Sequence, residues 1–228
     1  MKALVFDAGA LINFSMNGLL DILVKLKKEF PGKFLVTSII VDETINRPLG
    51  IKRYELGAMM IRELLKKNVV ELPSSVGIKD DEIEALTLNF LSKANKIFFA
   101  KDRAIHLIDK GEASCLALSE LLNKKGIENL IVIDERTTRM LCERPDNLHK
   151  LLKSKLHTKI EIKKDNFSVC TQLRFIRSCE LLYIAYKKGL LEIKDKNLLD
   201  ALLYAVKYKG CSVSHEEIVD MKAMQIEE

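Results

Sequence analysis

Four acidic residues stand at positions where carboxylates could act together in chemistry: Asp7, Glu43, Glu112 and Asp134. Two of them, Asp7 and Asp134, each end a short apolar run, residues 3–6 and residues 130–133. The two glutamates lie in segments with helical spacing. An Asp after a strand is usually a turn residue or a helix cap, and a Glu at a helix start usually complements the helix dipole. The apolar strand ending in Asp occurs twice, however, and this repetition favours a shared functional site.

Carboxylates that converge without a cation repel one another strongly. Mg²⁺ and Mn²⁺ resolve this repulsion because they bind oxygen ligands and retain several waters. One or two such ions can activate water, neutralise a phosphate and stabilise the leaving oxygen. We therefore expect Mg²⁺ or Mn²⁺ as the cofactor and phosphodiester hydrolysis as the reaction.

The elements that must position these acids follow from the hydrophobic pattern. Short apolar runs predict buried strands over residues 3–6, 34–37, 69–72 and 130–133. Helical spacing, with Ser38 as one N-cap, predicts helices over residues 19–30, 39–45, 52–67, 82–94 and 111–124. Alternating strands and helices are typical of an α/β protein with a mainly parallel sheet between helices. Ligands of such sheets bind outside the carboxyl ends of the strands, where Asp7 and Asp134 would lie.

The pattern changes after residue 140. Residues 155–164 are predicted as a fifth strand or a hairpin arm, and residues 173–188 and 198–209 as amphipathic helices. No Pro/Gly/Ser-rich linker interrupts the chain. We therefore expect a single domain over residues 1–228, with a core at about 1–140 and a helical extension at about 141–228.

Composition limits the compartment and the partners. The chain has 228 residues, 37 Lys plus Arg and 32 Asp plus Glu, so its net charge of +5 is compatible with a nucleic-acid partner. No signal peptide and no apolar run of membrane-spanning length are found, so we expect a cytoplasmic protein without a membrane partner. The five cysteines are odd in number and none are spaced as C-x-x-C. This argues against a zinc site and a disulfide framework, and favours a reducing compartment.

Four segments resemble the acidic motifs of PIN-domain nucleases, in the same order and with similar spacing. They are residues 4–12, 36–43, 109–118 and 131–139. The resemblance covers about residues 1–140. The stretches around residues 89–108 and 140–170 are longer than the family pattern.

The resemblance implies a three-layer α/β/α fold and a Mg²⁺- or Mn²⁺-dependent ribonuclease that acts on RNA. It implies that Asp7, Glu43, Glu112 and Asp134 are the metal ligands and catalytic residues. Arg136 and Arg139 follow the last motif acid and are candidate phosphate contacts. Many prokaryotic members are toxins inhibited by a small antitoxin, so a partner of that type and a homodimer are further expectations.

Two other functions are compatible with parts of the pattern. A haloacid-dehalogenase-type phosphatase would also begin with an apolar strand and Asp7, but its chemistry needs a second Asp at position 9, where this chain has Gly9. A catalytically inactive RNA-binding or protein-interaction scaffold would keep the fold without the reaction. The four acids argue against the scaffold.

Overall fold

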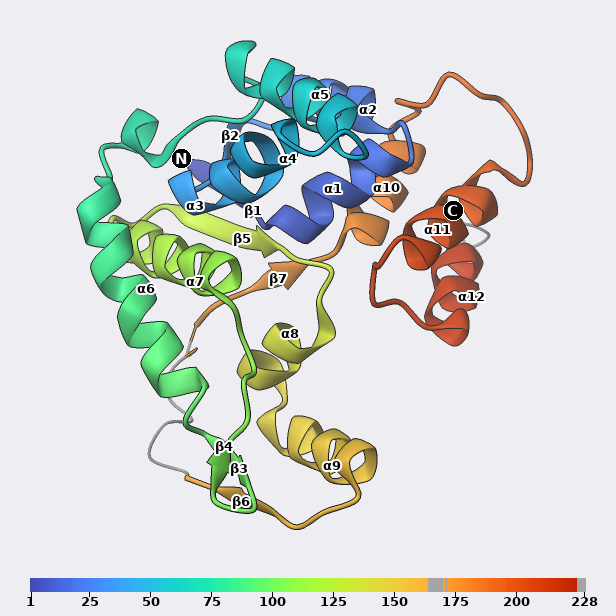
Figure 1. The fold of residues 1–228 in the computed structure, drawn as a ribbon. Helices are drawn as coiled ribbons and strands as arrows, with labels where there is room; N and C mark the ends of the chain where they lie inside the picture. The colour runs from blue at the N-terminus through green and yellow to red at the C-terminus, as the bar shows by residue number, and fades with distance from the viewer. Residues whose placement is uncertain (164–169, 171, 225–228) are drawn as a thin grey trace.

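The computed structural model describes residues 1–163, 170 and 172–224, and a four-stranded parallel sheet lies at its centre (Figure 1). The strand order is β2-β1-β5-β7. The strands are β1 (Lys2–Phe6), β2 (Gly32–Leu35), β5 (Glu128–Val132) and β7 (Phe175–Ile176). In the central register Leu4 pairs with Phe34 on one side and with Leu130 on the other.

The strand order reverses between β1 and β5. From β1 the chain moves outward to β2, and it later returns to the opposite side of β1 as β5. A crevice forms at such a reversal because the connections leave the two neighbouring strands in opposite directions. The carboxyl ends of β1 and β5 are therefore where the topology favours a ligand site.

Helices cover both faces of this sheet (Figure 1). One group consists of α1 (Ala8–Met16), α2 (Leu20–Glu29), α5 (Glu55–Lys66) and α10 (Ser178–Lys187). The other consists of α6 (Asp80–Ala94) and α7 (Lys110–Lys124). The expected α/β class, with a mainly parallel sheet between helices, is confirmed.

Helix α7 is the most enclosed element of the fold. Every residue from 111 to 119 is buried, and the helix contacts β1 and β5 on one side and α6 on the other. Its first half is apolar or small on all sides, which is typical of a buried helix. Burial of α7 fixes the position of its N-terminal acid, Glu112.

The segment after β2 forms one continuous helical rod with a π-helical turn inside it. The rod consists of α3 (Ser38–Val41), the π-helix η1 (Asp42–Asn46) and α4 (Arg47–Leu49). Its N-cap is Thr37 rather than the predicted Ser38, since Oγ1 of Thr37 accepts a hydrogen bond from the backbone N–H of Ile40 (3.2 Å). The π turn was not predicted.

Helix α1, which Asp7 caps, was not predicted, and one predicted strand of the core was wrong. Residues 69–72 are not a strand and make only one bridge, between Leu35 and Glu71. Pro73 opens the short 3₁₀ helix η2 (Pro73–Val76) two residues later, so the ladder cannot continue.

Segments from before and after β5 build a second part of the fold. It contains α8 (Arg136–Glu143), α9 (Pro145–Leu156) and an antiparallel sheet in the order β4-β3-β6. Its strands are β3 (Phe98–Ala100), β4 (Arg103–Ala104) and β6 (Ile160–Ile162). The strand expected over residues 155–164 is thus only β6, and it joins this second sheet rather than the first; residue 164 lies outside the described residues.

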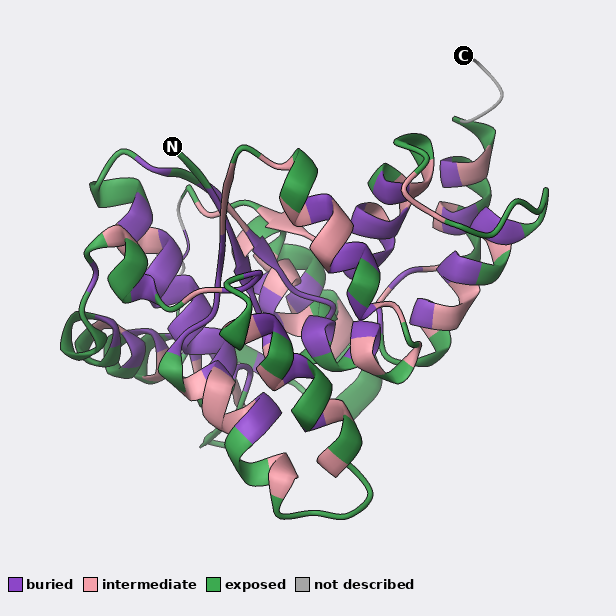
Figure 2. Cartoon of the chain, turned by 90° about the horizontal axis from the view of Figure 1, so that it is seen from above, coloured by how far each residue is buried: buried purple, intermediate pink, exposed green. Residues whose placement is uncertain are grey.

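The C-terminal elements complete the main sheet and its cover. The helix expected over residues 173–188 begins only at Ser178, because β7 precedes it. The helix expected over residues 198–209 is present as α11 (Leu198–Tyr208), and α12 (His215–Ala223) follows it. Buried apolar residues from Ala3 to Met221 form one cluster, so core and extension share a hydrophobic interior (Figure 2).

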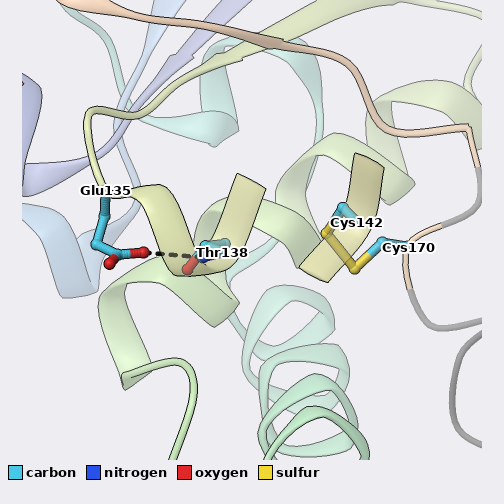
Figure 3. Close-up of a disulfide and its surroundings, with 4 residues drawn as sticks. All are labelled: Glu135, Thr138, Cys142 and Cys170. Carbon is cyan, nitrogen blue, oxygen red and sulfur yellow. Dashed lines mark hydrogen bonds between the residues drawn. A yellow bond between two sulfur atoms is a disulfide. The ribbon is translucent and has the colours of Figure 1, made fainter. Parts of the chain in front are cut away.

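One disulfide is present, although the number and spacing of the cysteines argued against a disulfide framework. Cys142 of α8 is bonded to Cys170 (Figure 3). The fold brings their Cα atoms to 4.9 Å although they are 28 positions apart, a proximity that sequence spacing does not reveal. Cys115, Cys179 and Cys211 are free and buried, as expected for small core residues.

No single helix in the described part of the chain is long and apolar enough to cross a membrane. Helices α1 and α2 reach the required length and composition only as a pair, and that pair is bent by 117°.

Candidate functional site

Asp7 lies at the carboxyl end of β1, directly at the reversal of strand order. Its side chain caps α1, since the backbone N–H of Gly9 donates to Oδ2 of Asp7 (3.0 Å). The residue is only 6% exposed. The pKa of Asp7 is raised to about 7. Burial is the main cause, the negative charges of Asp109 and Glu43 act in the same direction, and the hydrogen bond of the cap opposes them.

Glu112 comes to the same place from the first turn of α7. It forms a reciprocal cap with Asp109: the N–H of Glu112 donates to Oδ1 of Asp109 (2.8 Å), and the N–H of Asp109 donates to Oε2 of Glu112 (2.9 Å). Oε1 of Glu112 has no hydrogen-bond donor among the described residues. Burial raises the pKa of Glu112 to about 8, and the charges of Asp109, Asp7 and Glu135 contribute in the same direction.

Glu43 approaches from the π turn. Its carboxylate lies against Gly111 so closely that a Cβ at position 111 would collide with it. Burial raises the pKa of Glu43, and Asp109 adds to this effect while Arg47 opposes it. The rod that carries Glu43 is joined to α7 by a buried hydrogen bond between the hydroxyls of Thr37 and Ser114 (2.8 Å).

Asp134 lies at the same edge of the sheet, but both of its oxygens are already occupied. The N–H of Ser178 donates to Oδ1 (2.8 Å), and Oδ2 accepts from the Ser178 hydroxyl (2.7 Å) and from Nδ2 of Asn13 (2.9 Å). Asp134 is only 3% exposed and sits between α1 and the N-terminus of α10. The structure thus brings Asp7, Glu43 and Glu112 together and turns the carboxylate of Asp134 toward structural partners.

Two acids that the sequence analysis did not select are electrostatic neighbours of this cluster. Asp109 raises the pKa of Asp7, Glu43 and Glu112, and Glu135 raises that of Glu112. Glu135 also caps α8, since its carboxylate accepts a hydrogen bond from the N–H of Thr138 (2.8 Å; Figure 3). Both acids stand immediately before a predicted or observed helix start, which is the sequence signal that would have marked them.

The donor set of the cluster fits a hard divalent cation. Asp7, Glu43 and Glu112 offer only carboxylate oxygens, which are the ligands that Mg²⁺ and Mn²⁺ prefer. Because Gly111 has no side chain, the Glu43 carboxylate occupies the space that the Cβ of any other residue would fill. Within residues 1–163, 170 and 172–224, no three His, Cys, Asp or Glu side chains are arranged as ligands around one point.

Two cavities are lined by residues that the sequence marked as candidates. One, of about 330 Å³, is lined by Glu43 together with Asp42, Asp80 and Glu84, and by Arg47 and Lys110. Arg47 pairs with Asp42 (2.6 Å) and Lys110 with Glu84 (3.7 Å). Acids therefore outnumber bases there, and this cavity extends the negative surface around Glu43.

The second cavity, of about 570 Å³, is lined by Arg136 and Arg139 of α8. These are the two candidate phosphate contacts from the sequence. They lie beyond Glu135 along the same helix and do not line the cavity beside Glu43. The structure therefore separates a carboxylate cluster from an arginine-lined cavity, with Glu135 between them in the sequence.

No family model matches the chain, and no curated protein and no solved structure shows significant similarity to it.

Proposed function

We propose that this chain is a PIN-like, Mg²⁺- or Mn²⁺-dependent endoribonuclease whose metal ligands are Asp7, Glu43 and Glu112. One observation carries the proposal. The carboxylates of Asp7, Glu43 and Glu112 lie near one another where the strand order reverses, since the charge of Glu43 raises the pKa of Asp7 and the charge of Asp7 raises that of Glu112. That crevice is the usual ligand site of an open α/β sheet.

The electrostatics of the cluster support a functional reading. Burial raises the pKa of all three carboxyl groups, and the negative charge of neighbouring acids such as Asp109 raises it too. Groups with strongly shifted pKa values concentrate at functional sites. Burying several acids together destabilises the fold, so such an arrangement is typical of a site that function requires. The π turn that carries Glu43 also supports a functional site, since such turns are frequent at functional sites.

The chain's own residues divide the work of building this site. A bound divalent cation would supply water activation and phosphate neutralisation. Asp7, Glu43 and Glu112 would hold it, and Asp109 fixes the N-terminus of α7 so that Glu112 is held in place. We assign Asp134 a positioning role, because it ties the end of β5 to α1 and α10.

A non-catalytic RNA-binding or protein-interaction scaffold is the second candidate. The observation that favours it is that Asp7 and Glu112 both serve as helix caps. Capping alone gives each residue a structural reason to be acidic. Metal binding separates the two candidates, because a scaffold needs no affinity for Mn²⁺.

The test combines calorimetry with a cleavage assay. Purified protein is titrated with Mn²⁺ and then incubated with end-labelled single-stranded and structured RNA in Mn²⁺, in Mg²⁺ and in EDTA. We expect Mn²⁺ binding and internal cleavage, both lost in EDTA. Asp7→Asn and Glu112→Gln should lower the cleavage rate at least about 100-fold.

Asp21→Asn is the matched control, since Asp21 is an exposed acid of α2 that pairs only with Lys25. It should cleave RNA at the rate of the wild type. All variants are purified in the same way, so a contaminating nuclease would give the same cleavage in every sample, including Asp7→Asn. Mn²⁺ binding without cleavage would support the site and exclude the RNAs used. Neither binding nor cleavage would overturn the nuclease and favour the scaffold.

The small antitoxin-type partner, the homodimer and the cytoplasmic location stay predictions. Copurification of a small protein and the oligomeric state in solution would test the first two.

A further inference from the structure

The 570 Å³ cavity is built jointly by the two parts of the chain. Helices α8 and α9 form one wall, and the other comes from Arg177, the N-cap of α10, and from the turn that leads into α12. Its volume is in the range of ligand sites. Arg136 and Arg139 stand out in the sequence, but the cavity itself does not, because the residues of its two walls lie from 30 (Asn147 to Arg177) to 81 (Arg136 to Glu217) positions apart.

Its charge is positive. Four arginines line the cavity, Arg136, Arg139, Arg144 and Arg177, against two glutamates, Glu143 and Glu217. Arg177 is committed to the fold: it donates to Glu180 (2.7 Å), to Glu217 (2.8 Å) and to the carbonyl of Ser212 (2.9 Å). Arg177 thus neutralises Glu217 and holds the far wall in place.

The three remaining arginines are not satisfied by the protein. Arg139 meets Glu143 only at 3.7 Å, and its Nε is buried without a hydrogen-bond partner. Arg136 and Arg144 form no ion pair with any described residue. A buried donor without an acceptor costs free energy unless a ligand supplies the acceptor. Planar guanidinium groups match the oxygens of phosphate and carboxylate.

The lining also indicates what the ligand is not. None of the side chains that line the cavity is aromatic. Base recognition in single strands relies on aromatic stacking, whereas a sequence-independent grip uses charge on the backbone. The cavity therefore suits the phosphate of a nucleic acid rather than its base.

The cavity lies at the carboxyl end of β5, the strand that pairs with β1. Ser212, which lines the cavity, donates its N–H to the carbonyl of Asp134 (3.0 Å), and the N–H of Asp7 donates to the carbonyl of Val132 (3.0 Å). Arg136 directly follows the N-cap of α8. An RNA strand whose scissile phosphate reaches Asp7 and Glu112 would therefore carry a neighbouring phosphate toward Arg136 and Arg139.

We propose that this cavity binds a backbone phosphate of single-stranded RNA adjacent to the bond that is cut, through Arg136, Arg139 and Arg144, without reading the base. The inference rests on the proposed function, since it takes RNA as the ligand. It goes further by assigning a phosphate subsite and a sequence-independent substrate class.

The test measures RNA binding without cleavage. Fluorescence anisotropy in EDTA follows a labelled single-stranded RNA, in a polyuridine and a mixed-sequence form, at several salt concentrations. The double variant Arg136→Gln, Arg139→Gln should bind both RNAs about tenfold or more weakly at low salt. Its slope of log affinity against log salt should fall by about 1.4, because each phosphate contact in a single strand contributes about 0.7.

Arg62→Gln is the matched control. Arg62 of α5 also has a buried Nε without a partner, but it does not line the cavity. It should bind RNA like the wild type. If the double variant unfolds, the single variant Arg136→Gln replaces it, since Arg136 is exposed. Its slope of log affinity against log salt should fall by about 0.7, half of the change expected for the double variant.

Unchanged RNA affinity and slope in a folded double variant would overturn the proposal, and so would a wild type that binds no RNA. A fall as large in Arg62→Gln as in the double variant would also overturn it. Failure of the nuclease proposal would look different. The protein would then neither bind Mn²⁺ nor cleave RNA, but its arginine-dependent RNA binding in EDTA would persist.

Discussion

At the scale of single residues, Asp7 carries two demands that oppose each other. As the cap of α1 its ionised form is stabilised by the N–H of Gly9, but burial and the neighbouring acids disfavour that charge. The second effect prevails, since the pKa rises from 3.8 to about 7. Glu112 behaves in the same way, with a rise from 4.5 to about 8.

These two shifts predict how stability depends on pH. Between about pH 4 and pH 8 the folded protein holds more protons than the unfolded chain, so its free energy of unfolding falls as pH rises. Without divalent metal, Asp7→Asn should flatten this fall and gain about 2 kcal/mol relative to the wild type between pH 5 and pH 8. Urea unfolding across that range measures it.

Mn²⁺ provides the complementary measurement. At pH 8 it should raise the melting temperature of the wild type, because a ligand that binds only the folded state stabilises it, and it should leave Asp7→Asn unchanged. A wild type whose stability does not fall above pH 5 would contradict the assigned burial of these charges.

Asp134 should respond differently from the cluster acids. In Asp134→Asn an amide N–H₂ replaces one oxygen that now accepts hydrogen bonds from Ser178 or Asn13. We expect a loss of about 2–4 kcal/mol in the free energy of unfolding, with Mn²⁺ affinity kept within a few-fold. Calorimetry and urea unfolding measure the two quantities. Unchanged stability with lost Mn²⁺ binding would instead make Asp134 a ligand.

At the scale of elements, the site depends on how closely α7 and the rod of α3, η1 and α4 approach each other. A side chain at position 111 would displace the Glu43 carboxylate, which occupies that space. Ordinary helix propensity would favour Ala there by up to about 1 kcal/mol. The glycine therefore serves the approach of the two elements rather than the helix.

Gly111→Ala separates stability from site geometry. The variant should be as stable as the wild type or slightly more stable, while the displaced Glu43 should weaken Mn²⁺ binding about tenfold. Ser119→Ala, also within α7 but away from the acids, is a control for general effects on the helix. Unchanged Mn²⁺ affinity in Gly111→Ala would show that Glu43 is not a ligand.

A second pair of segments is joined covalently. The disulfide links α8, which lines the arginine cavity, to residue 170 across a separation of 28 positions (Figure 3). Reduction should lower the free energy of unfolding by roughly 3 kcal/mol, as expected for a closed loop of this length. Urea unfolding with and without a reductant tests this, and Cys142→Ser should be insensitive to the reductant. An equal response of both proteins would argue against the bond.

At the scale of the whole molecule, the C-terminal part is needed to complete the fold. It supplies β7 to the main sheet, Ser178 to Asp134, and one wall of the arginine cavity. Leu182 of α10 and Leu203 and Val206 of α11 are fully buried in the common core. The carboxylate cluster itself comes from residues before 140.

A chain ending at Arg144 should therefore fail to fold cooperatively. It would expose the apolar surface of α1 that α10 covers and the edge of β5 that pairs with β7, and it would leave the buried Asp134 without the donors of Ser178. Circular dichroism during thermal unfolding is the measurement, with the full chain as the reference. A sharp transition in the shortened chain would show that the first 144 residues are an independent domain.

Elements with strong local patterns could be predicted from the amino-acid sequence alone. Strands β1, β2 and β5 and helices α2, α5, α6, α7 and α11 were predicted because apolar runs and helical periodicity are properties of neighbouring residues. The sequence also marked Asp7, Glu43 and Glu112, because each follows a strand or lies near a helix start. We expected these acids to lie at one edge of the sheet because the carboxyl ends of parallel strands share an edge. The strand order, which reverses between β1 and β5, is consistent with that expectation.

Features that depend on contacts between distant segments became visible only in the folded chain. The stretches around residues 89–108 and 140–170 pair with each other through β3 and β6, and β7 is too short to show any periodicity. The direction of the Asp134 carboxylate depends on Ser178, 44 positions away. The disulfide and the arginine cavity likewise need two remote segments to meet. Such features follow from packing free energy summed over the whole chain, which no local window of sequence contains.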